Sequence, residues 1–164
     1  MFKIGIITAS DKGSRGERVD KSGQLIKEIM TENDYDVMEV RILPDDLDVL
    51  ADAMIDMADN KKYDLILTTG GTGFSMRDWT PEATKKVIHR EVPGIPEAMR
   101  AYSMKITPKG MLSRSAAGIR NATLIINLPG SPKAVRENLE CILPALRHGL
   151  EILVGSATEC GVEA

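Results

Sequence analysis

Cysteine, long apolar runs and excess positive charge are all scarce in this chain of 164 residues. Two cysteines cannot make a disulfide framework. No run approaches the roughly 20 apolar residues of a membrane-spanning helix, and residues 1–8 lack the apolar core and cleavage site of a secretory signal. The 24 acidic residues outnumber the 21 Lys and Arg, which argues against general nucleic-acid binding. We therefore expect a soluble, cytoplasmic protein that binds neither nucleic acid nor membrane.

Motifs that define several common enzyme classes are missing as well. The chain has no G-x-x-x-x-G-K-[ST] run, and a G-x-G-x-x-G pattern that starts at Gly71 fails at Met76. It has no G-x-S-x-G motif and no Cys/His spacing typical of zinc. These absences argue against a Walker nucleotide site, a dinucleotide fold, covalent acyl chemistry and a zinc centre.

Short apolar runs alternate with longer amphipathic segments in the first half of the chain. In order, the pattern predicts strand 2–9, loop 10–16, helix 21–33, strand 36–43, a helix opened by Asp45 and Asp46, and strand 64–69. Leu47, Leu50, Met54 and Met57 are expected on the buried face of the second helix. The strand–helix–strand–helix–strand order predicts an α/β fold with a parallel sheet and right-handed crossovers.

The second half is less regular, but it also reads as helices and strands. The predicted elements are a helix from Thr80 to about Arg90 with Thr80 as N-cap, a helix over 95–105, a hairpin of 113–120 with 123–128, and a helix from Ser131–Pro132 to about Val154. Nothing resembles a linker, so we expect one domain over residues 1–164, with a frayed tail at 155–164.

The run Thr68–Gly73 (TTGGTG) is the strongest local signal, and it directly follows the most apolar strand. Three glycines in four positions let the backbone turn tightly and bring its N–H groups close to an anion. Ligands of open parallel sheets bind at the carboxyl ends of strands. The run therefore predicts a phosphate cradle, with a strained turn that binds nothing as the alternative.

Acidic residues close to this turn favour a metal ion. Asp78 lies five residues beyond Gly73, and an acid beside a phosphate is unfavourable unless a cation lies between them. Mg²⁺ held by one or two carboxylates and phosphate oxygens is the common arrangement. Asp45 or Asp46, after strand 36–43, can reach the same sheet edge. Each acid also has a structural alternative, as a turn cap or in the first turn of a helix.

Two further segments are candidate anion sites. Leu128–Pro132 is a second strand-to-helix turn, whose helix N-terminus can bind phosphate or can simply be well capped. Arg114, next to Ser113, can clamp an anion as a bidentate donor, although most single arginines are only solvated.

The ordered set of these motifs resembles the MogA/MoaB family of molybdenum-cofactor biosynthesis proteins. The matching segments are Ser10–Asp11, Asp20–Gly23, Thr68–Gly73, Arg77–Asp78, Thr80–Thr84, Arg90–Gly94, Leu112–Arg114, Gly118–Arg120 and Thr123–Ser131. The likeness covers nearly the whole chain. The Leu-Ser-Arg and Asn-Leu-Pro-Gly segments make it more similar to MogA and the G domain of gephyrin than to MoaB.

The resemblance implies molybdopterin adenylyltransferase activity. The terminal phosphate of molybdopterin would attack the α-phosphorus of ATP, with Mg²⁺ required and pyrophosphate released. It also implies a three-layer α/β/α sandwich with a mostly parallel central sheet, the molybdopterin-binding fold. The expected assembly is a homotrimer, with a hexamer as the alternative, and the metal-inserting protein that acts next in the pathway is a candidate partner.

The resemblance also implies roles for particular residues. The essential carboxylates, which would hold the metal, fall on Asp78 and on Asp45, with the adjacent Asp46 as the alternative to Asp45. The expected nucleotide-phosphate residues are Thr69, Gly70, Gly71, Thr72 and Gly73. The expected molybdopterin residues are Ser113, Arg114, Pro129, Gly130 and Ser131. Which turn binds which substrate stays open.

Three other functions compete with this one. They are a non-catalytic molybdopterin-binding or scaffolding module, a MoaB-like paralogue of altered or reduced activity, and a nucleotide hydrolase, since similar domains also occur in CinA proteins. Pyrophosphate release from ATP in the presence of molybdopterin and Mg²⁺ distinguishes the adenylyltransferase from a binding module, and phosphate release from free nucleotides would identify a hydrolase.

Overall fold

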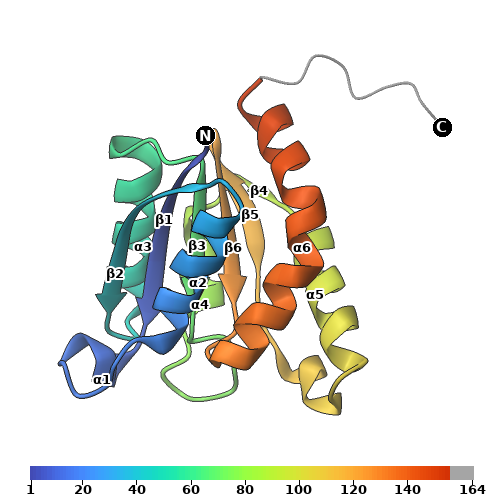
Figure 1. Ribbon diagram of the computed structural model, residues 1–164. Coiled ribbons are helices and arrows are strands. Elements are labelled where there is room, and N and C mark those ends of the chain that lie inside the picture. Colours follow the sequence, from blue (N-terminus) through green and yellow to red (C-terminus); the bar gives the residue numbers. More distant parts are fainter. Residues whose placement is uncertain (156–164) are drawn as a thin grey trace.

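A computed structural model describes residues 1–155, which build one six-stranded sheet (Figure 1). The strands are β1 (Lys3–Ala9), β2 (Asp36–Leu43), β3 (Leu65–Thr69), β4 (Arg90–Glu91), β5 (Ala117–Arg120) and β6 (Thr123–Leu128). Their order across the sheet is β2-β1-β3-β6-β5-β4. Neighbouring strands from β2 to β6 pair in parallel, whereas β5 and β4 complete the sheet as antiparallel strands. The mostly parallel sheet and the β5–β6 hairpin are therefore confirmed.

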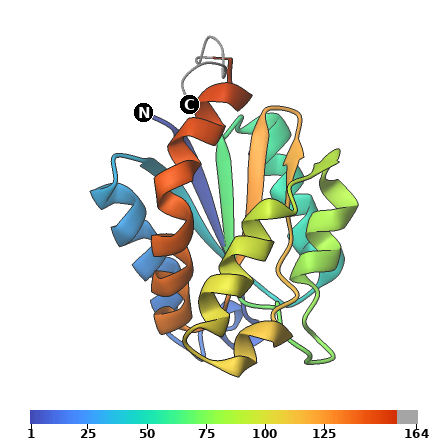
Figure 2. The same cartoon turned by 90° about the vertical axis from the view of Figure 1, so that its right-hand side faces the viewer.

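Helices cover both faces of this sheet. They are α1 (Asp11–Ser14), α2 (Lys21–Glu32), α3 (Leu47–Ile55), the π-helical turn η1 (Asp56–Asn60), α4 (Thr80–Val87), α5 (Gly94–Met104), the 3₁₀ turn η2 (Pro108–Leu112) and α6 (Pro132–Leu153). One face packs against α2, α5 and α6, and the opposite face packs against α3 and α4 (Figure 2). This arrangement confirms the three-layer α/β/α sandwich.

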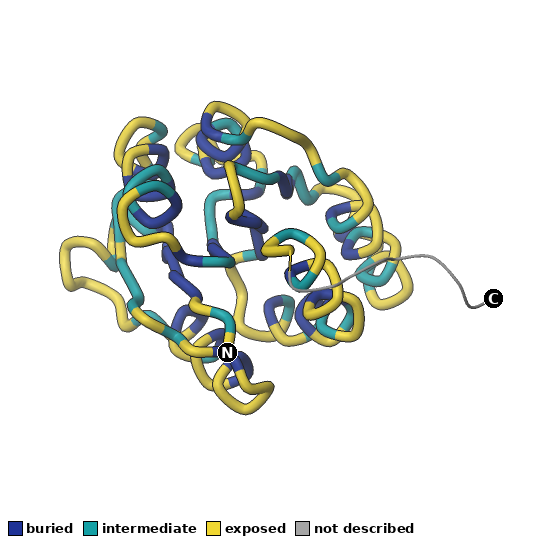
Figure 3. The backbone as a smooth tube through the Cα atoms, turned by 90° about the horizontal axis from the view of Figure 1, so that it is seen from above, coloured by how far each residue is buried: buried dark blue, intermediate teal, exposed yellow. Residues whose placement is uncertain are grey.

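The period-2 alternation of the strands explains why both faces hold a core. In β3, Leu65 and Leu67 join the α2–α5–α6 cluster, while Ile66 joins the α3–α4 cluster. In β1, Ile6 and Ile7 divide in the same way. Buried segments consequently occupy the centre of the molecule, and the outer sides of the helices are exposed (Figure 3).

The topology opens a crevice at one edge of the sheet. The strands β1, β2, β3 and β6 end at this edge, which is the lower one in Figure 1. The chain leaves β1 through α2 on one face and leaves β2 through α3 on the other. The connections therefore diverge beside the ends of β1 and β3, which is where open α/β sheets bind ligands.

Two local predictions near this edge were wrong. The predicted loop 10–16 contains the short helix α1, which Ser10 caps by accepting a hydrogen bond from the Gly13 N–H at 3.0 Å. Thr80 does not cap α4; it is the first helical residue, and its Oγ1 donates to the Gly70 carbonyl oxygen at 2.9 Å. The hydroxyl therefore joins the helix to the glycine turn.

Two boundaries at the other end of the sheet also differ from the prediction. Helix α4 ends at Val87, because Arg90 and Glu91 pair with Ile119 and Gly118 as β4. Residues 113–116 precede β5 without joining it. Within residues 1–155, no helix combines the length and apolar character that crossing a bilayer requires. The predicted frayed tail, from residue 156 on, lies outside the described residues.

Candidate active site

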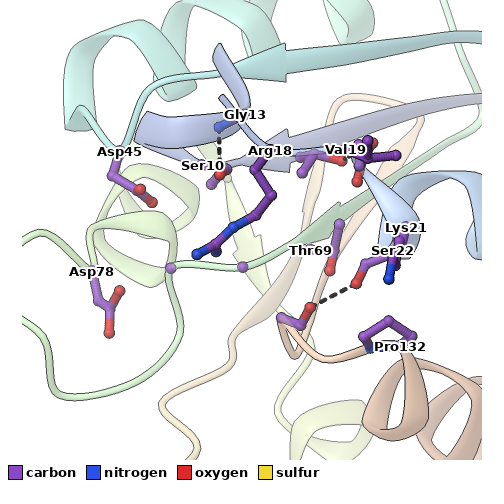
Figure 4. A pocket seen from close by; sticks show the side chains of 16 residues that line it. Ser10, Gly13, Arg18, Val19, Lys21, Ser22, Asp45, Thr69, Asp78 and Pro132 are labelled. Carbon is purple, nitrogen blue, oxygen red and sulfur yellow. Dashed lines mark hydrogen bonds between the residues drawn. The ribbon is translucent and has the colours of Figure 1, made fainter. Parts of the chain in front are cut away.

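A cleft of about 680 Å³ lies at the carboxyl edge of the sheet, over the ends of β1, β3 and β6 (Figure 4). Segments that are far apart in sequence meet here. Its lining consists of Thr8, Ala9, Ser10, Gly13, Arg18, Val19, Asp20, Lys21, Ser22, Asp45, Thr69, Gly70, Gly71, Asp78, Gly130 and Pro132. The topology thus brings Asp45, Asp78 and both predicted turns to one cleft.

The first turn, residues 69–73, can be built only with glycine at two positions. Gly70 and Gly71 have φ angles of +88° and +68°, in the left-handed region that favours glycine. A Cβ on Gly70 would lie 2.5 Å from the Ala9 carbonyl oxygen, and one on Gly71 would lie 2.3 Å from Thr80 Oγ1. The absence of side chains leaves this backbone free to approach a ligand in the cleft.

The second turn, residues 128–131, is held against the first. Thr69 Oγ1 donates to the Pro129 carbonyl oxygen at 2.7 Å, and Ser22 Oγ donates to that of Gly130 at 2.6 Å. Ser131 does not line the cleft; it caps α6 by accepting a hydrogen bond from the Ala134 N–H at 3.2 Å. The N-terminus of this 22-residue helix, the positive end of its dipole, therefore starts beside the glycine turn.

Two carboxylates border the glycine turn. A Cβ on Gly71 would lie 3.3 Å from Asp45 Oδ1, and one on Gly73 would lie 3.0 Å from Asp78 Oδ2. Burial raises the pKa of Asp45, and the negative charges of Asp11 and Asp78 add to this effect. The adjacent Asp46 caps α3 instead, accepting a hydrogen bond from the Val49 N–H at 3.0 Å. Of the two neighbouring acids, Asp45 is the one in the cleft.

Asp11 supports Asp45 through a reciprocal pair of hydrogen bonds. The N–H of each residue donates to the carboxylate of the other at 3.0 Å. Arg77 forms a bidentate ion pair with Asp11, with N···O distances of 2.6 and 2.9 Å, and lowers the pKa of Asp11. Arg77 is thereby directed to Asp11, and Asp45 has no ion-pair partner among the described residues.

This donor set fits a magnesium ion that is bound together with phosphates. Within residues 1–155, no group of three or more His, Cys, Asp or Glu side chains could hold a metal by itself. Asp45 and Asp78 offer two carboxylates beside the turn, and Mg²⁺ usually takes one or two carboxylates and completes its shell with phosphate oxygens and water. The partly buried, unpaired charge of Asp45 favours such a cation.

Of the ten cleft residues that were not predicted as part of the site, four are polar or charged residues of segment 18–22. Arg18 and Lys21 are exposed and have no ion-pair partner in the described part of the chain, and Arg18 extends over the middle of the cleft (Figure 4). Asp20 caps α2 and accepts a hydrogen bond from Thr8 Oγ1 at 2.8 Å, whereas Ser22 holds Gly130. Their place after β1, a strand that ends at the same edge, was the available signal.

The remaining predicted residues lie on the other side of the glycine loop. Thr72, Gly73, Ser113 and Pro129 line an adjacent cavity of about 270 Å³. Arg114 lines neither this cavity nor the larger cleft, and its guanidinium contacts the loop after the glycine turn. Apart from Arg114 and Ser131, the predicted nucleotide and molybdopterin residues are therefore divided between two adjoining spaces.

The fold and the cleft define an α/β protein with a glycine turn and a helix N-terminus side by side at the carboxyl edge of a mostly parallel sheet. Residues 5–148 match the family described as a probable molybdopterin binding domain. The chain belongs to this family, and the predicted family and fold are confirmed.

Named relatives agree with this assignment. The molybdopterin adenylyltransferase of Helicobacter pylori strain J99 is 45% identical over 93% of this chain and 88% of its own length. Gephyrin of Dictyostelium discoideum is 46% identical over 92% of this chain, which corresponds to 22% of gephyrin. The crystal structure of the molybdopterin biosynthesis enzyme MoaB from Thermus thermophilus superposes with a TM-score of 0.90, at 47% identity, over 94% of this chain and 98% of that one. Identity alone does not separate the two family branches.

Proposed function

We propose that this protein transfers AMP from ATP to the terminal phosphate of molybdopterin and releases pyrophosphate. One observation carries the proposal: Asp45 and Asp78 border a glycine turn at the same edge as a helix N-terminus, in a chain of this family. Support also comes from the relatives that are named molybdopterin adenylyltransferase.

The reaction needs orientation and charge neutralisation more than a strong base. An oxygen of the terminal phosphate, already ionised at neutral pH, forms a new bond to the α-phosphorus of ATP. The bond between that phosphorus and the bridging oxygen to the β-phosphate breaks, and pyrophosphate leaves with the electron pair. Positioning and electrostatic stabilisation dominate phosphoryl transfers of this kind.

The chain offers separate groups for the two substrates. The backbone of Gly70, Gly71 and Gly73 is assigned to the ATP phosphates, with Arg18 and Lys21 as additional cations in the cleft that Gly70 and Gly71 line. Molybdopterin is assigned to the side of the α6 N-terminus, with Gly130 in the larger cleft and with Ser113 and Pro129 in the smaller cavity. Thr69 binds the Pro129 carbonyl, so its hydroxyl supports the second turn.

Asp45 and Asp78 are the residues that would hold Mg²⁺. When bound, the ion would neutralise phosphate charge and help to orient the two substrates. The two carboxylates repel each other and the phosphates, and a cation bound between them would offset this repulsion.

Replacing the two acids tests the proposal. Asp45→Asn and Asp78→Asn should each lower pyrophosphate release from ATP, molybdopterin and Mg²⁺ by at least about 100-fold. Asp46→Asn is the matched control, because it removes the adjacent charge while asparagine still caps α3. Near-normal turnover by Asp78→Asn would remove this residue from the mechanism. Molybdopterin binding without any pyrophosphate release by the wild type would favour the non-catalytic module.

The assembly and cellular location that we propose follow from the family. A homotrimer in the cytoplasm is expected, handing its product to a metal-inserting protein. Sedimentation of the purified protein distinguishes the trimer from a monomer or a hexamer.

A further inference from the structure

Arg114 connects the two ends of the loop that carries Asp78. Its Nε donates to the Gly73 carbonyl oxygen at 2.7 Å, and its Nη2 donates to that of Asp78 at 2.8 Å. The backbone N–H of Arg114 also donates to the Thr72 carbonyl oxygen at 2.9 Å. One guanidinium edge therefore closes the Gly73–Asp78 loop.

The rest of the Arg114 guanidinium is directed away from the cleft. Nη1 forms an ion pair with Glu82, in the first turn of α4. The second carboxylate oxygen of Glu82 is buried and has no hydrogen-bond partner among the described residues. All three guanidinium nitrogens thus contact the protein itself, which favours a structural role over direct contact with a substrate.

The Gly73–Asp78 loop has little else to fix it. Its apolar side chains do not pack into the core, since Phe74 is 71% exposed and Met76 is 92% exposed. Among the described residues, the Asp78 carboxylate accepts a hydrogen bond only from the Ser75 N–H, within the same loop. The ion pair between Arg77, in this loop, and Asp11 lies at the surface, where ion pairs are weak and screened by salt.

We propose that Arg114 is a positioning residue that fixes the Asp78 carboxylate beside the glycine turn. The link to catalysis rests on the proposed function, whereas the link to loop order does not. The two carbonyl oxygens are held by a planar fork of parallel donors, which lysine does not possess. Arg114→Lys therefore keeps a positive charge near Glu82 but cannot hold both ends of the loop.

Arg120 supplies a matched control at the opposite edge of the sheet. It also uses Nε and Nη2 as a fork, at 3.0 and 2.6 Å from the Asp59 carboxylate, and its Nη1 donates to the Val87 carbonyl oxygen at 2.8 Å. Arg120→Lys thus breaks a comparable arginine network far from the cleft. Glu82→Gln is a second control, which removes the ion pair and leaves the fork on the loop.

The experiment compares the three variants by turnover and by hydrogen exchange. For Arg114→Lys, kcat at saturating ATP should fall about 10- to 100-fold, because small misplacements of reacting groups cost that much. Amides of residues 74–78 should exchange about tenfold faster or more, and amides of the sheet should not change. Arg120→Lys and Glu82→Gln should keep kcat within about threefold of the wild type, whatever they do to stability.

Two results would overturn the proposal. One is unchanged exchange over residues 74–78 in Arg114→Lys. The other is an equal loss of kcat in Glu82→Gln, which would show that the ion pair with α4 matters rather than the fork. If the wild-type protein itself releases no pyrophosphate, the proposed function fails, and the exchange comparison still decides whether Arg114 orders the loop.

Discussion

The turns after β3 and β6 lie side by side, yet they are built in opposite ways. The turn after β3 contains two left-handed glycines and continues into an exposed loop before α4 begins. The turn after β6 leads directly into α6, with Ser131 as a regular N-cap and Pro132 in the first turn. Both turns accept hydrogen bonds from side chains elsewhere in the chain, but the second turn is also held by the N-cap of its own helix.

This difference indicates a division of roles. Thr80 and Arg114, both outside the first turn, bind the carbonyl oxygens of Gly70, Gly73 and Asp78. The first turn therefore positions the loop with Asp78 beside the cleft. Its conformation requires two left-handed glycines and hydrogen bonds from residues distant in sequence. The second turn contributes a helix N-terminus, and Thr69 and Ser22 donate hydrogen bonds to its Pro129 and Gly130 carbonyl oxygens.

Alanine at the two glycines gives the largest expected contrast. Gly70→Ala should destabilise the protein by about 3 kcal/mol or more, because the left-handed φ is unfavourable and the new Cβ would meet the Ala9 carbonyl at 2.5 Å. Gly130→Ala should cost at most about 0.5 kcal/mol, since its Cβ would make only an ordinary 3.5 Å contact with Gly70 Cα. Urea unfolding measures both. Equal losses would show that the two turns are equally constrained.

Thr80→Val tests the external support of the first turn. Thr80 is fully buried, and its loss as a donor leaves the Gly70 carbonyl oxygen without that hydrogen bond. The cost should be about 1–3 kcal/mol, measured by urea unfolding, and Thr80→Ser should restore much of the lost stability. A valine variant as stable as the wild type would mean that the hydroxyl does not support the turn.

Ser131→Ala tests the internal support of the second turn. Removing the N-cap should cost about 1 kcal/mol, again measured by urea unfolding, because the Ala134 N–H loses its partner. Replacement by aspartate, another good cap, should recover stability. A larger loss of stability than that of Thr80→Val would show that the second turn depends more on its supporting hydrogen bond than the first turn does.

The smallest expected effect comes from removing the negative charge of Asp45 beside the first turn. Asp45→Asn should raise the melting temperature of the ligand-free protein by about 1–3 °C at neutral pH. Because burial and neighbouring acids raise the pKa of Asp45, the folded wild type loses stability as the pH rises through that pKa. The advantage of asparagine should therefore shrink as the pH falls toward about 4. Adding Mg²⁺ and ATP should stabilise only the wild type; equal stabilisation of both proteins would argue against Asp45 as a ligand.

The two turns also show what the sequence can predict. Thr80–Pro81 and Ser131–Pro132 carry the same signature, and only Ser131 is a cap. The Thr80 hydroxyl instead donates a hydrogen bond to the Gly70 carbonyl oxygen. This contact depends on how the turn folds back, and nothing in the neighbouring sequence indicates it. In contrast, β1, β2, β3 and β6 were predicted because their apolar residues are contiguous or alternate along the chain.

The sequence predicted those site residues whose position follows from the topology. It did not predict the contacts that depend on how individual side chains pair. Because the parallel strands end at the same edge of the sheet, the sequence predicted that Asp45 and Asp78 lie near the glycine turn. It left Asp46 as an alternative to Asp45, and the structure shows that Asp46 caps α3 instead. The segment after β1 obeys the same rule, so Arg18 and Lys21 could have been included. The contacts of Arg114 could not be predicted, because they join residues about 40 positions apart.

The central claim is that both acids and the glycine turn bind one metal–nucleotide complex. A crystal structure with Mn²⁺ and a non-hydrolysable ATP analogue tests it most directly, since the anomalous signal locates the ion. We predict that the ion contacts the carboxylates of Asp45 and Asp78 and that the phosphates lie against residues 69–73. A nucleotide bound elsewhere, or an ion that touches neither carboxylate, would contradict this account.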